Sequence, residues 1–423
     1  MVTKGACDDG RHQMTIRPLQ IHRGGCPEDG SQFVRLESAE AIELYGRVQP
    51  DAEADGIEAQ ARSMYANLRA LLSEQGLHGA DVLTERLFFA DIAAHNETVR
   101  QVRATTYAAD RKDLPASTFL LQSPTAAGRL IELQVYVLHP LSATYGVEAL
   151  AGLPSAAAGW RVTQPGQTHI HLQNLVGGDD LATADFRTQC QDLFERLHGV
   201  LREHNVPVQQ LIRTWIYLRD LERDYDVLNE VRNACFAEWG VTYLPASTGI
   251  EGGPHPTTWR ICIDACISWG EGIQDIQVMH GDSLGEASDY GSAFSRGLCV
   301  QRPDRTVLYV SGTASIDTAG QVVHVGDIDG QCRRMLDNVD ALLRPYGATL
   351  VDTVHAVTYL KERAYLPVFE RVCRERDVPA DLLNTIVVAD VCRPDWLCEI
   401  ELTAVLRRTT SPLPTNRVPL APR

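Results

Sequence analysis

Apolar and polar residues alternate along residues 396–405, near the end of the chain. This alternation predicts a β-strand, in which Glu399 and Glu401 project from one face and apolar residues from the other. Similar stretches occur earlier, at residues 129–137 and 259–267. The chain is therefore predicted to use one structural unit three times, with the third copy carrying both glutamates.

The same order of elements precedes each of these strands. Apolar positions at helical spacing predict the first helix of each unit at residues 58–72, 186–201 and 327–343. The tetrapeptide Pro-Ala-Ser-Thr stands before the closing strand at 115–118 and again at 245–248. A shared tetrapeptide within a shared order of elements indicates tandem repeats.

The predicted units have their strands too close together for a doubly wound sheet. We therefore expect an α+β fold, in which two helices pack on one face of a mixed β-sheet. Residues 270–290, rich in Gly, Asp and Ser, are the best linker candidate. The predicted organisation is an N-terminal tail (1–32), three units (33–140, 155–270 and 290–408) and a C-terminal tail (409–423).

Composition narrows the function classes. A chain of 423 residues exceeds one ordinary core, and its net charge of −16 argues against nucleic acid or an anionic membrane as partner. A small anionic substrate is compatible with this net charge, because a pocket in an acidic protein can be locally basic. No apolar run is long enough to span a bilayer, and the first residues have no hydrophobic signal region, so a cytoplasmic location is expected. The 11 cysteines include no CxxC pair and no zinc spacing, so neither a disulfide framework nor a metal site is expected.

Six motifs in the second and third units resemble those of the chorismatases, within the YjgF-like reactive-intermediate deaminase superfamily. They span roughly residues 160–408, whereas the first unit resembles only the superfamily fold. In chain order the motifs are Tyr225-x-x-Leu228-Asn229-x-x-Arg232, Pro245-Ala-Ser-Thr-Gly-Ile250, Ala293-Phe-Ser-Arg296, Val310-Ser-Gly-Thr-Ala-Ser-Ile316, Gln331 with Asn338, and Cys392-Arg-Pro-Asp-Trp-Leu-Cys-Glu399-Ile-Glu401.

The resemblance implies both an assembly and a reaction. Superfamily members are small α+β units that form trimers with active sites in the clefts between units. Three units in one chain would form a pseudo-trimer within a monomer, and a homo-oligomer is the alternative. The implied reaction cleaves chorismate to pyruvate plus 3-hydroxybenzoate or a dihydroxycyclohexadiene carboxylate, without metal or cofactor.

Cleaving the enol ether of chorismate requires protonation of its terminal methylene carbon. That step needs a carboxylic acid that still holds its proton near neutral pH, and a glutamate between apolar strand neighbours has its pKa raised by desolvation. Glu399 is the expected acid, since it stands at the family's position. Glu401 points the same way and is the alternative acid. Glu399 could instead have no catalytic role and be a carboxylate at the rim of the site, paired with an arginine.

Two substrate carboxylates call for arginines, which bind them bidentately. Tyrosine and hydroxyl groups are further expected contacts, and a glycine would let the substrate ring lie close to the backbone. By resemblance, Cys392 lines the cavity and influences which product forms. The expected substrate contacts are Arg213, Arg232, Arg296, Arg393, Tyr217, Tyr225, Gly312, Thr313, Ser315 and Glu401. A solvated helix face for Arg232 and core packing for the tyrosines and Cys392 remain alternatives.

Two other functions compete with this one. Imine or enamine deaminases of the superfamily resemble one another in a Pro-x-Arg-Ser/Thr segment, and the arginine is absent from the corresponding segments 115–118, 245–248 and 379–382. A non-catalytic metabolite-binding protein is the second alternative, and the first unit, with few of the motifs, is expected to be structural. The exact substrate, the product and the pathway served stay open.

Overall fold

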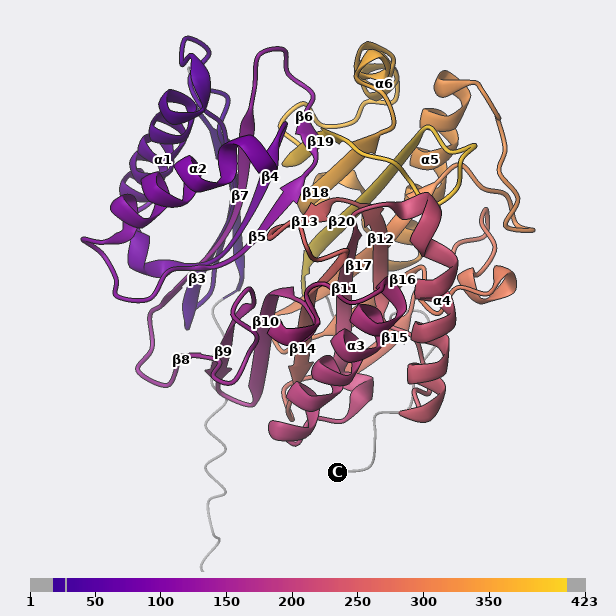
Figure 1. Cartoon of the computed structure of the whole chain (residues 1–423), viewed down its shortest axis with the longest axis horizontal. Helices are drawn as coiled ribbons and strands as arrows, with labels where there is room; N and C mark the ends of the chain where they lie inside the picture. The colour runs from indigo at the N-terminus through magenta and orange to yellow at the C-terminus, as the bar shows by residue number, and fades with distance from the viewer. Residues whose placement is uncertain (1–17, 27–28, 409–423) are drawn as a thin grey trace, which may run out of the picture.

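The computed structural model describes residues 18–26 and 29–408. Three mixed β-sheets turn toward one another, and each carries its pair of helices on the outside (Figure 1). This is the predicted α+β arrangement, used three times.

The first sheet is built almost entirely from the first unit. Helices α1 (Gly56–Glu74) and α2 (Ile92–Tyr107) cover it. In spatial order its strands are β1 (Gln20–Gly25), β2 (Gln32–Glu37), β3 (Ala41–Val48), β7 (Ile131–Pro140), β4 (Val82–Phe89), β5 (Ala116–Leu121) and β13 (Gly253–Pro254).

The second sheet has six strands and carries helices α3 (Phe186–Glu203) and α4 (Leu221–Glu238). In spatial order its strands are β12 (Ala246–Glu251), β11 (Leu211–Leu218), β14 (Ile261–Trp269), β10 (Gln167–Leu175), β9 (Ala158–Gln164) and β8 (Gly146–Ala149).

The third sheet places the strand with the two glutamates at its centre. Helices α5 (Ile328–Leu343) and α6 (Leu366–Glu375) cover it. In spatial order its strands are β15 (Asp275–Val278), β16 (Gly297–Gln301), β17 (Arg305–Ala314), β20 (Cys398–Arg407), β18 (Thr353–Leu360), β19 (Asn384–Val388) and β6 (Ser123–Pro124).

Local sequence explains where several helices begin. An aspartate precedes α2, α3, α4 and α5, and in each case its carboxylate accepts a hydrogen bond from a backbone N–H of the first turn. The capping residues are Asp91, Asp185, Asp220 and Asp327. The apolar faces that follow pack on the sheets, which is why helical periodicity located α3 and α5 correctly.

The register of the sheets shows which residues correspond between units. Phe89 pairs with Ile131, Leu218 with Ile261, and Leu360 with Cys398, at the start of each closing strand. Counting along β7, β14 and β20 makes Glu132, Cys262 and Glu399 equivalent. Two residues further, Gln134, Asp264 and Glu401 are equivalent.

The units exchange small strands and polar contacts across their boundaries. The second unit's β13 pairs with β5, and the first unit's β6 pairs with β19. Thr118 Oγ1 donates to Asp264 at 2.5 Å, and Gln134 Nε2 donates to Thr385 Oγ1 at 2.8 Å. The three sheets therefore form one continuous body.

Two expectations about irregular segments need correction. Residues 20–25, expected within the N-terminal tail, form β1, because their backbone pairs antiparallel with β2. Residues 275–278, expected within a linker, form β15 at the edge of the third sheet by pairing with β16. The rest of the expected N-terminal tail up to residue 17, and the C-terminal tail 409–423, lie outside the described residues.

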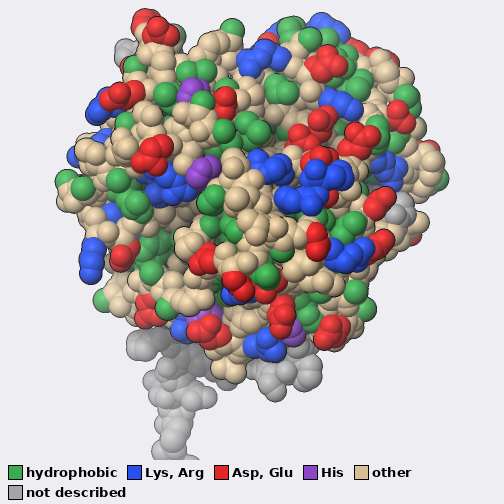
Figure 2. All heavy atoms as spheres, viewed as in Figure 1, with side chains coloured by type: hydrophobic (Ala, Val, Ile, Leu, Met, Phe, Trp, Pro, Cys, Tyr) green, Lys and Arg blue, Asp and Glu red, His purple; other side chains and the backbone are tan. Residues whose placement is uncertain are grey.

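The described structure shows how charged and apolar residues are distributed. On the face in Figure 2, basic side chains are flanked by acidic ones. Within the described ranges, no helix is both long and apolar enough to cross a membrane.

Candidate active site

Glu399 lies on the central strand of the third sheet. It pairs with Ala314 on β17 and with Tyr359 on β18, and the residue is only 3% exposed. On the opposite face of β20, the Cys398 Sγ atom lies 3.8 Å from Cys332 Sγ of α5. Because side chains alternate along a strand, the Glu399 carboxyl group points away from the helices and toward the second unit.

Gly312 makes room for this carboxyl group. A Cβ atom at position 312 would lie 1.9 Å from Glu399 Oε1 and 3.1 Å from Thr248 Cγ2. The backbone N–H of Gly312 donates to Thr248 Oγ1 at 3.0 Å. A glycine is therefore required here, where β17 of the third unit meets β12 of the second.

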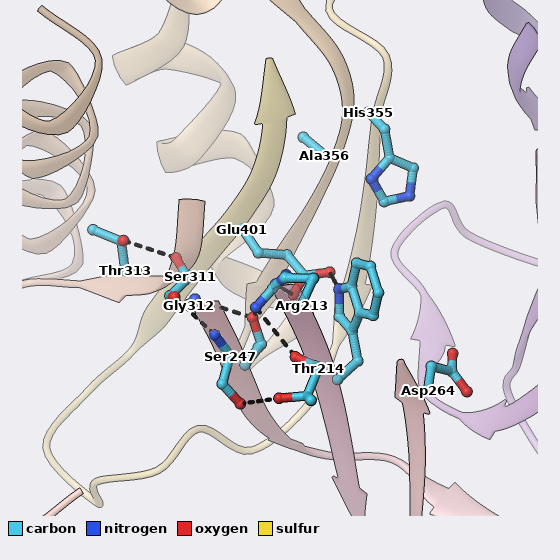
Figure 3. Close-up of polar contacts among 12 residues, drawn as sticks. Arg213, Thr214, Ser247, Asp264, Ser311, Gly312, Thr313, His355, Ala356 and Glu401 are labelled. Atoms are coloured by element: carbon cyan, nitrogen blue, oxygen red, sulfur yellow. Dashed lines mark hydrogen bonds and ion pairs between the residues drawn. The ribbon is translucent and has the colours of Figure 1, made fainter. Parts of the chain in front are cut away.

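Glu401 is held as a fixed anion across the same boundary (Figure 3). Its Oε2 atom accepts a hydrogen bond from Arg213 Nη2 at 2.7 Å, and its Oε1 atom accepts one from Trp215 Nε1 at 2.8 Å. Arg86 Nη1, from the first unit, lies 3.8 Å from Oε1. All three units thus contribute to the surroundings of this carboxylate.

The two glutamates differ in protonation because their partners differ. Burial, and then the negative charge of Glu401, raise the pKa of Glu399 to about 8, while the charges of Arg296 and Arg213 oppose the shift. Within the described chain, no hydrogen bond to the Glu399 carboxyl group is formed. At neutral pH Glu399 is therefore a buried carboxylic acid beside a fixed carboxylate.

Helix α4 supplies the wall opposite Glu399. Tyr225 and Arg232, seven residues apart, lie on one face of this helix. A Cβ atom at Gly249 would be 3.4 Å from the Tyr225 ring and 3.9 Å from Cys392 Sγ, and the Cys392 thiol donates to the Gly249 carbonyl at 2.8 Å. Burial, with the nearby Glu399 charge, raises the pKa of the Cys392 thiol, so this cysteine stays a neutral thiol.

Two of the expected arginines converge on one aromatic ring. The guanidinium carbons of Arg232 and Arg296 lie 5.7 and 5.5 Å from the ring centre of Phe294. Arg296 Nε donates to the Gly285 carbonyl at 2.7 Å, and Arg232 Nη2 donates to Asn229 Oδ1 at 2.6 Å. Both arginines are 2% exposed, so they place positive charge inside the protein on the α4 side of the boundary between the second and third units.

Arg393 follows Cys392 directly in the chain. Its Nη1 atom donates to the Gly320 carbonyl at 2.7 Å, and its guanidinium lies 5.1 Å from the centre of the Trp396 ring. It is a third positive charge bordering the Cys392 wall.

Four expected substrate contacts are engaged elsewhere. Ala314 pairs with Glu399 and shares its face of the sheet, so the neighbouring Thr313 and Ser315 side chains lie on the opposite face. Their hydroxyls donate to the backbone carbonyls of Ser311 and Val323, respectively. Arg213 is committed to Glu401 and Thr248. The Tyr217 side chain is buried in the core, with the Arg86 guanidinium 5.9 Å from its ring centre.

Sequence reasoning missed residues that the folded chain brings to this site. Thr248 hydrogen-bonds both Arg213 and Gly312. It occupies the position equivalent to Thr118 in the first unit and Thr385 in the third, and this recurring threonine was the sequence signal that could have identified it. Phe294 stood inside a recognised motif without being singled out. Arg86 carried no local signal, because it comes from the first unit and reaches Glu401 only through the tertiary fold.

The equivalent positions in the other two clefts lack this arrangement. In the first unit, Glu132 is ion-paired with Arg47, which occupies the position of Gly312. In the second unit, Cys262 replaces the glutamate and Asn174 replaces the glycine. Among the residues that the structure describes, the unpaired carboxyl with a glycine beside it occurs once, between the second and third units.

Similarity to known proteins identifies the superfamily. Residues 291–406 match the family model described as Endoribonuclease L-PSP. The 3-aminoacrylate deaminase RutC of Acinetobacter baylyi is 31% identical over 98 residues, which cover 23% of this chain and 78% of that protein. The chain belongs to the YjgF-like superfamily. The prediction made from its motifs is confirmed at that level.

Within the YjgF-like superfamily, the chain is similar to chorismatases. A chorismatase of Streptomyces hygroscopicus is 30% identical over 236 residues, covering 49% of this chain and 65% of that protein. A 3-hydroxybenzoate synthase of the same organism is 34% identical over 223 residues, covering 45% and 62%. The chain thus spans slightly less than two thirds of the length of these two relatives.

A solved structure extends the likeness to the whole fold. The crystal structure of a chorismatase superposes with a TM-score of 0.60 at 19% identity, covering 86% of this chain and 99% of that one. The tandem YjgF-like architecture predicted from the repeats is therefore confirmed.

Proposed function

We propose that this protein cleaves the enol ether of chorismate, releasing pyruvate, with Glu399 as the general acid. One observation carries the proposal: a buried glutamic acid with a pKa of about 8, free of hydrogen bonds within the described chain, lies at the boundary between the second and third units. The similarity to a chorismatase and a 3-hydroxybenzoate synthase supports the choice of substrate.

The first step transfers the Glu399 proton to the terminal methylene carbon of the enolpyruvyl group. This carbon becomes a methyl group, and the adjacent ether carbon becomes an oxocarbenium ion. The Glu399 carboxylate left behind and the fixed carboxylate of Glu401 both stabilise the positive charge that develops. Because Glu401 already accepts hydrogen bonds from Arg213 and Trp215, Glu399 is better suited to deliver the proton.

The second step decides the product. When water adds to the oxocarbenium carbon, Glu399 takes up the released proton, and the hemiketal collapses to pyruvate and a dihydroxycyclohexadiene carboxylate. Capture of the intermediate by the ring instead leads toward 3-hydroxybenzoate. Cys392, held by the Gly249 carbonyl beside Tyr225, stands where it would exclude or admit water.

Recognition of the two substrate carboxylates falls to the arginines on the α4 side. Arg232 and Arg296 share the Phe294 ring, and Arg393 borders Cys392. A dianion entering this cleft would exchange their present carbonyl and amide contacts for charge-assisted hydrogen bonds. We assign Arg213 a different role, which is to hold Glu401.

The test is pyruvate release from chorismate by the purified protein, with Glu399→Gln alongside and the ring product identified by chromatography. Release by the wild type, abolished in the variant, is the expected result. A protein that leaves chorismate untouched contradicts the proposal. Turnover of 3-aminoacrylate in its place would favour the deaminase alternative, for which the likeness to RutC is the specific observation.

A further inference from the structure

A separate cavity of about 100 Å³ lies where the three sheets meet. The cross-strand pairs Tyr45 with Tyr136, His171 with Cys266, and Tyr309 with Thr403 all line it. These pairs occupy equivalent positions in the three units, because the register is equivalent along β7, β14 and β20. The cavity therefore lies on the axis that relates the units, and Glu399 does not line it. We call it the axial chamber.

The axial chamber continues into a smaller space of about 40 Å³. The two spaces share five wall residues, Tyr45, Tyr136, His171, Cys266 and Tyr309. The smaller space adds Arg302, which is half-buried. The chamber thus has aromatic walls along its length and a guanidinium group at one end.

Arg302 has no direct hydrogen-bond or ion-pair partner among the residues that the structure describes. Its Nε atom is buried without a hydrogen bond, and within the described ranges its side chain forms no hydrogen bond or ion pair. The neighbouring carboxylates of Glu43 and Asp304 are both bound by Arg305. A guanidinium group that is half-buried without an anion is costly, so this end of the chamber favours an anionic ligand.

Two other polar groups in the walls also have no hydrogen-bond partner among the described residues. Neither the Tyr45 hydroxyl nor the His171 ring forms a hydrogen bond within the described part of the chain. Burial and the charge of Arg302 lower the pKa of His171 to about 4, so its imidazole is neutral at pH 7. The walls therefore hold two guanidinium groups, Arg302 and Arg86, and the carboxylate of Glu43, beside neutral hydrogen-bonding groups around an aromatic space. Arg86 is ion-paired with Asp264 and Glu43 with Arg305, which leaves Arg302 as the cation available to a ligand.

We propose that the axial chamber is a second binding site, for a small aromatic carboxylate. Its carboxylate would pair with Arg302, and its ring would lie among Tyr45, Tyr136 and His171. The Tyr45 and Tyr136 ring centres are 5.0 Å apart, and those of Tyr136 and His171 are 5.1 Å apart, the separations of interacting aromatic groups. The two spaces together approach the cavity of about 150 Å³ that is known to admit benzene in another protein.

Both parts of the ligand are needed to satisfy the chamber. A simple inorganic anion would pair with Arg302 and leave the aromatic part empty, while a neutral arene would leave Arg302 unpaired. The site also adjoins the catalytic network, because Trp215 lines the chamber and donates through Nε1 to Glu401. A bound ring would thus lie behind the anion that faces Glu399.

Calorimetric titration of the full chain with benzoate tests the proposal. Arg302→Gln removes the unpaired cation of the chamber, and Arg232→Gln is the matched control because it removes a buried arginine of the candidate active site. We expect at least a tenfold loss of benzoate affinity in Arg302→Gln and little change in Arg232→Gln. Benzamide, which has the same shape without the charge, and inorganic phosphate are both expected to bind at least tenfold more weakly than benzoate.

Several results would overturn it. Absence of benzoate binding, a loss confined to Arg232→Gln, or phosphate binding as tightly as benzoate would each do so. If Arg302→Gln does not fold, a crystal structure of the wild type with benzoate decides, since the ring must lie in the axial chamber against Tyr45 and Tyr136 rather than beside Glu399.

Discussion

Arg213 Nη2 lies 2.7 Å from Glu401 Oε2, and both side chains are 1% exposed. This buried ion pair joins the second unit to the third and fixes a negative charge two residues from Glu399 on the same strand face. That charge and the burial of Glu399 give two neighbouring carboxyl groups different protonation states at neutral pH. Such a divided pair is how a protein supplies an acid and an anion in one site.

The rate of chorismate cleavage should fall as pH rises through about 8, the pKa of Glu399, because the acid form is then lost. Glu399→Gln keeps the shape but holds no transferable proton, so a loss of about 10²–10⁴-fold in kcat is expected. Steady-state pyruvate release between pH 5 and 10 measures both effects. A profile that stays flat through pH 8 would exclude Glu399 as the acid.

Folding stability should also fall as pH rises, because of the same group. Between pH 4.5 and about 8, native Glu399 keeps a proton that the unfolded chain has released, so this group destabilises the fold progressively as pH rises. The contribution is roughly 1.4 kcal/mol per pH unit. Glu399→Gln removes it, so the variant's stability relative to wild type should increase from pH 5 to pH 8 in urea unfolding. A difference that does not change with pH would contradict the raised pKa.

Much of this fold could be predicted from local patterns, because the unit recurs three times and alternation or helical spacing locates its elements. The helix predicted at residues 186–201 begins where α3 begins and ends within its last turn. β1 and β15 were missed because both are edge strands whose pairing partners are not visible in local composition.

The candidate site was predictable where a motif carried it and not where tertiary structure decided. Glu399, Gly312 and Arg232 came from motifs. Arg213 binds Glu401 and is therefore not available to bind substrate. This contact joins two units, so it could not be predicted from a local sequence pattern. The direction of the Thr313 and Ser315 hydroxyls could not be predicted for a similar reason, since a register shift in β17 between Val310 and Thr313 sets which face they occupy.

Gly312→Ala should impair both stability and catalysis. Its new Cβ atom would lie 1.9 Å from Glu399 Oε1, so the carboxyl group or the strand must shift. A cost of about 1–3 kcal/mol in unfolding free energy is expected, with a larger proportional loss in kcat than in KM. Gly199→Ala is the matched control, since a Cβ there, on α3, has no neighbour within 4 Å and should leave activity unchanged. Equal behaviour of the two variants would refute the steric argument.

The three units should make this chain self-sufficient as a monomer. The strand pairs β13 with β5 and β6 with β19 already join units within one chain. Sedimentation equilibrium should therefore give a mass near the chain mass of 46.7 kDa. A mass three times larger would show that the units assemble between chains.

Glu401→Gln should move the alkaline limb of the pH–rate profile to lower pH. Removing the negative charge of Glu401 removes one cause of the raised pKa of Glu399, and it leaves Arg213 to favour the ionised form of Glu399 further. Asp264→Asn is the matched control, because Asp264 is the equivalent residue in the neighbouring cleft and makes its contacts with Arg86 and Thr118. Its substitution should change stability without moving the limb. If the limb moves equally in both variants, the shift reflects general loosening of the interface, and Glu401 does not set the acidity of Glu399.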